Sequence, residues 1–67
     1  MNDCKSMERA LAHFKKCWPE HEATLDELES YPGHWHIGIT EPVCGLTAWY
    51  WFDSVRDFRE WTDGVVL

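Results

Sequence analysis

Residues 34–52 read HWHIGITEPVCGLTAWYWF, and this stretch decides the fold. It holds two runs, 35–40 and 46–52, in which successive residues alternate in character and aromatic and β-branched residues are frequent. Such alternation is typical of half-buried strands. Between the runs, Pro42 suits the first central position of a type I turn, and Gly45 can adopt the left-handed conformation that returns the chain. We therefore predict a β-hairpin.

A loop over residues 42–45 also predicts which residues lie opposite one another. The expected pairs are Thr40–Thr47, Gly38–Trp49, His36–Trp51, Ile39–Ala48, Ile37–Tyr50 and Trp35–Phe52. A slip of one residue would mix the apolar set of one strand with the polar set of the other. The core face would then carry Trp35, Ile37, Ile39, Leu46, Ala48, Tyr50 and Phe52. The opposite face, called the outer face below, carries His34, His36, Thr40, Thr47, Trp49 and Trp51.

Amphipathic helices are expected on both sides of the hairpin. Residues 3–17 show helical spacing of apolar side chains, with Asp3 as a cap and Pro19 ending the helix nearby. Their apolar stripe is Cys4, Met7, Leu11, Phe14 and Trp18, with Ala10 and Cys17 alongside. A last helix is predicted over residues 54–62, capped by Asp53 or Ser54 and followed by Gly64 as a C-terminal cap. Its stripe is Val55, Phe58 and Trp61.

The segment 20–31 is strongly acidic. It contains five carboxylates and no Lys or Arg: Glu20, Glu22, Asp26, Glu27 and Glu29. Thr24 followed by Glu27 has the spacing of a capping box, which predicts a short helix over residues 25–30 with Leu25 and Leu28 turned inward. Pro32 and Gly33 then turn the chain into the hairpin.

The expected architecture is a single α+β domain over residues 1–67, in the order helix, short helix, β-hairpin, helix. The sheet would be two-stranded and antiparallel, with residues 65–67 as a candidate for a third short edge strand. Because a two-stranded sheet needs a packing partner to be stable, we expect the helices to cover one of its faces.

Composition narrows the function classes. The formal net charge is −6, which argues against direct binding of nucleic acid through phosphate neutralisation and against adsorption to an anionic membrane. The chain shows neither the pattern of a signal peptide nor a long apolar run, so we expect a cytoplasmic protein. In a reducing compartment, its three cysteines are expected to be thiols.

Metal and catalytic chemistry receive little support from the sequence. His34 and His36 share a strand face, Cys17 and His21 form a second pair, and Cys44 is a further thiol. Zinc needs about four converging ligands, and Pro19 interrupts the helix that would align the second pair. No catalytic signature is present, and so short a chain rarely builds a deep pocket. We expect no enzymatic activity, no cofactor and no metal.

The best interpretation is a non-enzymatic binding protein whose partner is another protein with a basic surface. The acidic segment and the exposed aromatic side chains of the outer face would provide the contacts. The candidate partner-binding residues are Glu20, Glu22, Asp26, Glu27, Glu29, His34, His36, Trp49 and Trp51. In size and charge the chain is similar to phage and mobile-element inhibitors of the anti-CRISPR or anti-restriction kind, which act by nucleic-acid mimicry.

Two alternatives remain open at this stage. One is a homodimeric domain joined through the outer face of the hairpin, which requires that the first helix leave Trp49 and Trp51 uncovered. The other is a small zinc-binding module.

Overall fold

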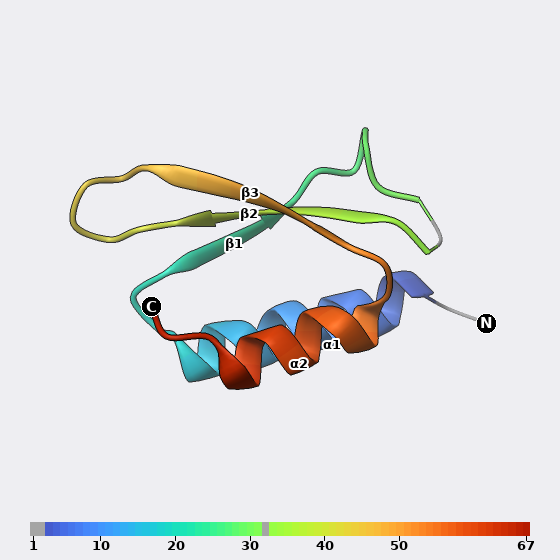
Figure 1. The fold of residues 1–67 in the computed structure, drawn as a ribbon, viewed down its shortest axis with the longest axis horizontal. Coiled ribbons are helices and arrows are strands. Elements are labelled where there is room, and N and C mark those ends of the chain that lie inside the picture. Colours follow the sequence, from blue (N-terminus) through green and yellow to red (C-terminus); the bar gives the residue numbers. More distant parts are fainter. Residues whose placement is uncertain (1–2, 32) are drawn as a thin grey trace.

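The computed structural model describes residues 3–31 and 33–67, and the side chains of residues 3 and 4 are not part of that description. Within these ranges, two helices and three strands follow in the order α1, β1, β2, β3, α2 (Figure 1). Their bounds are α1 Asp3–Cys17, β1 Glu22–Leu25, β2 Trp35–Thr40, β3 Thr47–Phe52 and α2 Val55–Gly64. The predicted α+β class is confirmed. The expected cap at Asp3, the burial of Cys4 and the turn at Pro32 lie outside the described residues and side chains.

The hairpin has the predicted register. β2 and β3 pair antiparallel, and all six expected pairs, from Trp35–Phe52 to Thr40–Thr47, are present. The loop closes through two backbone hydrogen bonds: the Glu41 N–H donates to the Leu46 carbonyl at 2.9 Å, and the Gly45 N–H donates to the Glu41 carbonyl at 3.0 Å. Gly45 has φ = 73°, the left-handed conformation expected of it.

The prediction of a short helix over residues 25–30 is wrong. β1 pairs antiparallel with β2 instead, so the sheet has three strands in the order β1-β2-β3. A turn follows, in which Asp26 Oδ1 accepts hydrogen bonds from the backbone N–H groups of Leu28 (3.1 Å) and Glu29 (3.4 Å). Asp26 thus satisfies locally the donors that the expected capping box would have used. Leu28, predicted to point inward, is 97% exposed.

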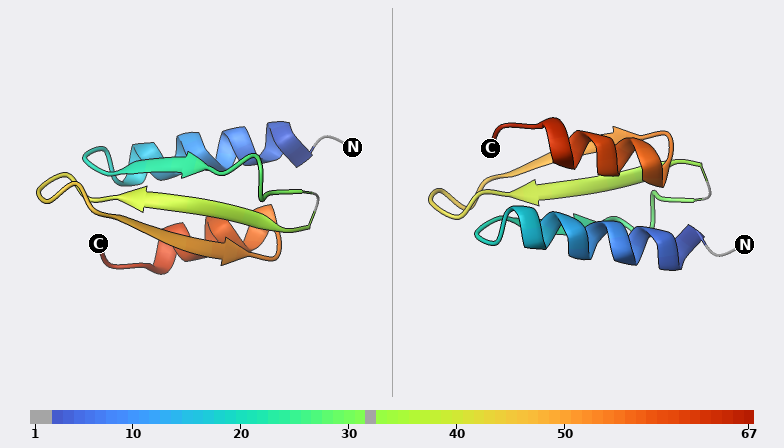
Figure 2. Two further views of the ribbon diagram at one scale, coloured as in Figure 1. Left: turned by 90° about the horizontal axis from the view of Figure 1, so that it is seen from above. Right: turned by 90° about the horizontal axis from the view of Figure 1, so that it is seen from below.

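The two helices lie side by side and cover one face of the sheet. They run in the same direction, with α1 beneath β1, α2 beneath β3 and β2 above the space between them (Figure 2). Between the layers lies the core: Met7, Ala10, Phe14, Trp35, Ile37, Ile39, Phe52 and Phe58. The Phe14 ring connects the helices, because it stacks on Phe58 at 6.1 Å and on Trp61 at 6.2 Å between centroids.

Several details of the predicted core and helix ends need correction. Leu46 and Ala48 were expected in the core but are exposed, and so is Cys17. Residues 65–67 form no strand. Ser54, one of the two predicted caps, caps α2, but Gly64 lies inside that helix and the C-terminal cap is Val65. Neither helix in the described ranges combines the length and apolar character needed to cross a membrane.

Candidate functional site

The outer face of the sheet is left uncovered by the helices and carries most of the predicted site. The pairing of β1 with β2 extends this face beyond the hairpin. Glu22 lies opposite Thr40 and Thr24 lies opposite Gly38, so the two side chains of β1 share the outer face. The face therefore combines aromatic, hydroxyl and acidic groups on three adjacent strands.

A continuous row of rings forms the centre of the outer face. His36 stacks on Trp51 with centroids 3.9 Å apart, and it also contacts Trp49 at 4.8 Å. Trp51 also contacts His34 at 4.5 Å, and Tyr31 stacks on His34 at 4.5 Å. The rings touch in the order Tyr31, His34, Trp51, His36, Trp49, and we call these five residues the aromatic row. Trp49 and Trp51 are 48% and 51% exposed, so α1 does not cover them.

Gly38 makes room for one end of this row. A Cβ atom at that position would lie 2.9 Å from Cη2 of Trp49 and 2.9 Å from Cγ2 of Thr47. The indole therefore lies directly over the β2 backbone, which only a residue without a side chain allows. This close approach holds Trp49 against the sheet while its outer side stays open to solvent.

Two of the predicted acidic residues reach the aromatic row. His36 Nδ1 lies 3.0 Å from Glu29 Oε2 and 3.3 Å from Asp26 Oδ2. The His36 side chain is largely buried between these carboxylates and the two indoles. The turn after β1 is thus attached to the row through one imidazole. The sequence indicated the residues, but not this contact.

The other acidic residues are spread along β1 and do not share one helical surface. Glu20 lies in the turn before the strand, whereas Glu27 lies in the turn that follows it. Glu22 is on the outer face, with Oε2 2.9 Å from Nζ of Lys15. The negative charge therefore forms a line beside the aromatic row, along the β1 edge of the sheet.

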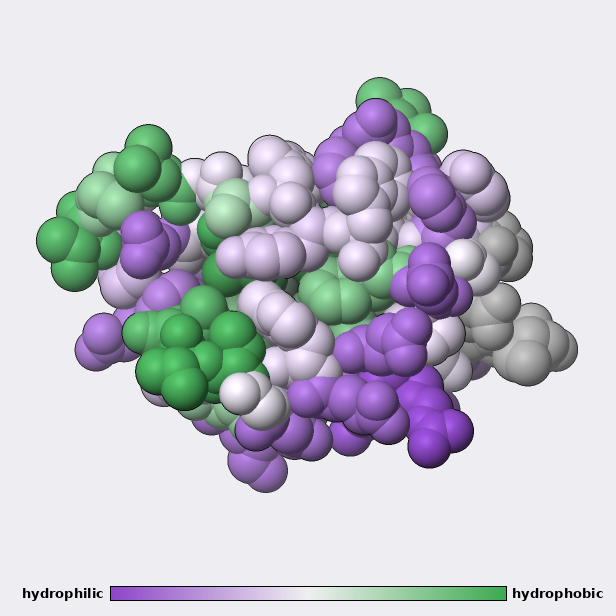
Figure 3. Space-filling model, viewed as in Figure 1, coloured by the Kyte–Doolittle hydropathy of each residue, from purple (hydrophilic) through white to green (hydrophobic). Residues whose placement is uncertain are grey.

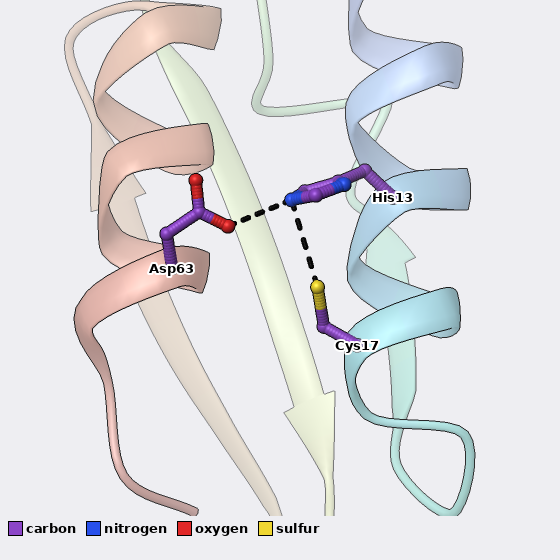
Figure 4. Close-up of side chains that lie close together, drawn as sticks. All are labelled: His13, Cys17 and Asp63. Carbon is purple, nitrogen blue, oxygen red and sulfur yellow. Dashed lines mark hydrogen bonds and ion pairs between the residues drawn. The ribbon is translucent and has the colours of Figure 1, made fainter.

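A second cluster lies between the two helices, and the sequence analysis missed it. His13 and Cys17 come from the last turns of α1, and Asp63 comes from the last turn of α2 (Figure 4). His13 Nε2 is 2.7 Å from Asp63 Oδ1 and 3.6 Å from Cys17 Sγ. The spacing of His13 and Cys17, four residues apart in a predicted helix, could have indicated the pair. Nothing in the sequence placed Asp63 beside them.

This cluster is not arranged as a catalytic triad. A carboxylate can only accept a hydrogen bond, so the Nε2 that contacts Asp63 carries the hydrogen. The same nitrogen faces Cys17 and has no free lone pair to remove the thiol proton. In a nucleophilic triad, the acid holds one imidazole nitrogen and the nucleophile faces the other. The geometry does not activate Cys17 as a nucleophile.

Cys44 and the apolar surface lie at one end of the molecule. Cys44 donates a hydrogen bond from its thiol to Glu41 Oε2 at 3.2 Å, inside the hairpin loop. Hydrophobic side chains form two patches at this end, one on the loop and one at the C-terminus, with hydrophilic residues between them (Figure 3). An open groove there is lined by Ile39, Leu46, Ala48, Tyr50 and Leu67, with His21, Glu41 and Thr47.

The sequence suggested two pairs of possible metal ligands, Cys17 with His21 and His34 with His36. In the described part of the chain, neither pair lies together in a group of three close donor atoms.

Comparison with protein-family models, with curated proteins and with solved structures gives no match. Two sites in the structure bear on function: the outer face of the sheet and the cluster of His13, Cys17 and Asp63. Of these, the outer face includes most of the residues that the sequence singled out.

Proposed function

We propose that this protein is a non-enzymatic binding domain that docks on another protein through the outer face of its sheet. The observation that carries the proposal is the aromatic row, in which two indoles contact His36 and remain half exposed. Tryptophan and tyrosine dominate the energetics of protein interfaces, and exposed apolar patches commonly mark partner sites. A rigid indole also loses little conformational entropy on binding.

The partner we propose has a basic surface. Asp26, Glu27 and Glu29 follow β1, Asp26 and Glu29 contact His36 of the row, and the whole chain carries a net charge of −6. Charge of one sign next to an aromatic anchor speeds association with a surface of the opposite sign and suppresses wrong partners. Basic clefts are typical of proteins that bind nucleic acids. Inhibition of such machinery, in the manner of an anti-CRISPR or anti-restriction protein, is the specific form of the proposal.

Binding kinetics with a partner captured from the native host would test the proposal. Trp51→Ala should mainly raise the dissociation rate, because a buried anchor holds a formed complex together. Glu27→Lys should lower the association rate at low salt, and this effect should fade as salt rises, since exposed charges are screened over about 8 Å at physiological ionic strength. The control is Glu8→Lys, an exposed charge reversal on α1. Equal effects of the two reversals would exclude docking through the outer face.

Self-association through the sheet edge is a second candidate. β3 is an edge strand of the described sheet, and its sequence TAWYWF contains no charged residue. Natural edge strands usually carry charges or other features that prevent pairing with another chain. A molecular mass that rises with concentration in sedimentation experiments would favour a dimer joined through β3. A constant monomer mass would exclude it.

A further inference from the structure

We propose that His13, Cys17 and Asp63 form a binding site for a zinc-class divalent ion that connects α1 to α2. The site is independent of the proposed docking surface, because it lies in the helical layer and the outer face is on the other side of the sheet (Figure 4). The three donor atoms all lie within 4.8 Å of one another. The sequence-based expectation of no metal rested on other pairs of residues, Cys17 with His21 and His34 with His36, and not on this set.

The distances fit an ion with tetrahedral geometry. An ion about 2.0–2.1 Å from an imidazole nitrogen and about 2.3 Å from a thiolate sulfur holds these two atoms about 3.6 Å apart. His13 Nε2 and Cys17 Sγ are 3.6 Å apart in the structure. The contact from Nε2 to Asp63 Oδ1, now 2.7 Å, would have to widen to about 3.4 Å to admit the ion. Asp63 can make this movement because its side chain is 64% exposed.

The types of donor select the ion. One imidazole, one thiolate and one carboxylate suit zinc and neighbouring transition metals, whereas magnesium and calcium prefer oxygen ligands alone. Three protein ligands leave a fourth position for water. On binding, the imidazole hydrogen is carried on Nδ1 instead of Nε2, and the thiol proton is released to solvent. Affinity should therefore rise with pH.

The helix arrangement also favours a cation at this place. α1 and α2 run in the same direction, so their C-terminal ends lie at the same end of the molecule (Figure 2). Cys17 is the last residue of α1, and Asp63 is the penultimate residue of α2. The C-terminus of a helix carries a partial negative charge. The last turn of α2 contains no basic residue. The last turn of α1 contains Lys15 and Lys16, and Lys15 is paired with Glu22.

The other group of possible ligands, Asp26, Glu29 and His36, has weaker support. Both of its carboxylates already contact the single Nδ1 of His36, and the imidazole is stacked on Trp51 and contacts Trp49. It contains no thiol. This difference makes the group a useful internal control, since its residues and those of the proposed site can be changed separately.

Titration of the reduced, chelator-treated 67-residue chain with Co²⁺ and Zn²⁺ would test the proposal. We expect one equivalent of Co²⁺ to produce a sulfur-to-cobalt charge-transfer band and the visible absorption of a tetrahedral ion, and Zn²⁺ to displace it. Cys17→Ser should remove the charge-transfer band, and the matched variant Cys44→Ser should keep it. His13→Gln should weaken Zn²⁺ binding by more than the roughly 10–100-fold typical of changes outside the ligand shell. His21→Gln and His36→Gln should leave it unchanged.

Stability gives a second readout that does not depend on colour. Zinc should raise the melting temperature of the wild type and of Cys44→Ser, because an ion that binds only the folded chain stabilises it. The melting temperature of Cys17→Ser should not respond. Circular dichroism of each variant before metal is added confirms that it folds. A wild type that binds neither ion, a band that survives in Cys17→Ser, or one ion shared by two chains would each overturn the proposal.

Discussion

The imidazole of His36 lies almost parallel to the indole of Trp51, with centroids 3.9 Å apart and planes 9° from parallel. The same imidazole contacts Glu29 through Nδ1 at 3.0 Å. One side chain therefore joins the aromatic row to the acidic turn after β1. A substitution in the row should therefore alter the environment of the residues in the turn, although the two are far apart in the sequence.

Replacing Trp51 should change the surface and not the fold. Because its indole is half exposed, Trp51→Ala should cost only about the 0.2–1 kcal/mol that a cross-strand pair contributes. The matched control is Trp35→Ala on the same sheet, where the indole is 4% exposed and about 3–5 kcal/mol should be lost. Urea denaturation measures both. The amide NMR signals of residues 26–29 should shift in Trp51→Ala as His36 loses its support. Equal destabilisation by the two variants would mean that the outer face belongs to the core.

Gly38→Ala should destabilise the sheet. The added methyl group would lie 2.9 Å from both Trp49 and Thr47, so the indole must leave its position over β2. We expect a loss of about 1–3 kcal/mol, as for other substitutions that overfill a packed site. Gly64→Ala is the matched control, because its Cβ meets nothing within 4 Å. In a helix, that change should stabilise by about 0.4–1 kcal/mol.

A double-mutant cycle would show whether the indole causes this effect. In a Trp49→Ala background, Gly38→Ala should cost less than in the wild type, because one of the two clashing side chains is gone. Additive costs in the cycle would show that the glycine is required for a reason other than its contact with Trp49.

The hairpin could be predicted because several local signals agree there. Period-two alternation, the turn residues Pro42 and Gly45 and the pairing of Gly38 with Trp49 all indicate one register. β1 could not be predicted in the same way, since it has four residues and only Ala23 and Leu25 face the core. So short an alternation also fits one turn of a helix, and pairing with β2 decides between the two.

The candidate sites differ in the same way in how far the sequence predicts them. The outer face followed from the hairpin register, so His34, His36, Trp49 and Trp51 were placed together correctly. The contact of Asp26 with His36 depends on β1, which the sequence did not indicate. Asp63 is 50 residues from His13, and only the packing of α1 beside α2 brings the two side chains together.

The buried face of β2 should dominate the stability of the domain. Ile37 is fully buried at the centre of the core, so Ile37→Ala should lower the free energy of unfolding by about 2–5 kcal/mol. Val43→Ala in the exposed hairpin loop is the control and should stay within about 0.5 kcal/mol of the wild type. Denaturation midpoints would measure the difference. Similar midpoints for the two variants would contradict the assignment of the core face.

The start of α2 offers a test of a single hydrogen bond. Ser54 has an extended backbone, and its Oγ accepts a hydrogen bond from the Asp57 N–H at 3.0 Å, which satisfies one of the free donors of the first turn. Ser54→Ala should therefore lower the free energy of unfolding by about 1 kcal/mol. Ser54→Asp should retain most of the stability, because a carboxylate accepts the same bond and interacts favourably with the helix dipole. Asp53 was the other cap that the sequence allowed, and it is exposed outside the helix. Asp53→Ala should have little effect, and a loss larger than that of Ser54→Ala would move the cap to Asp53.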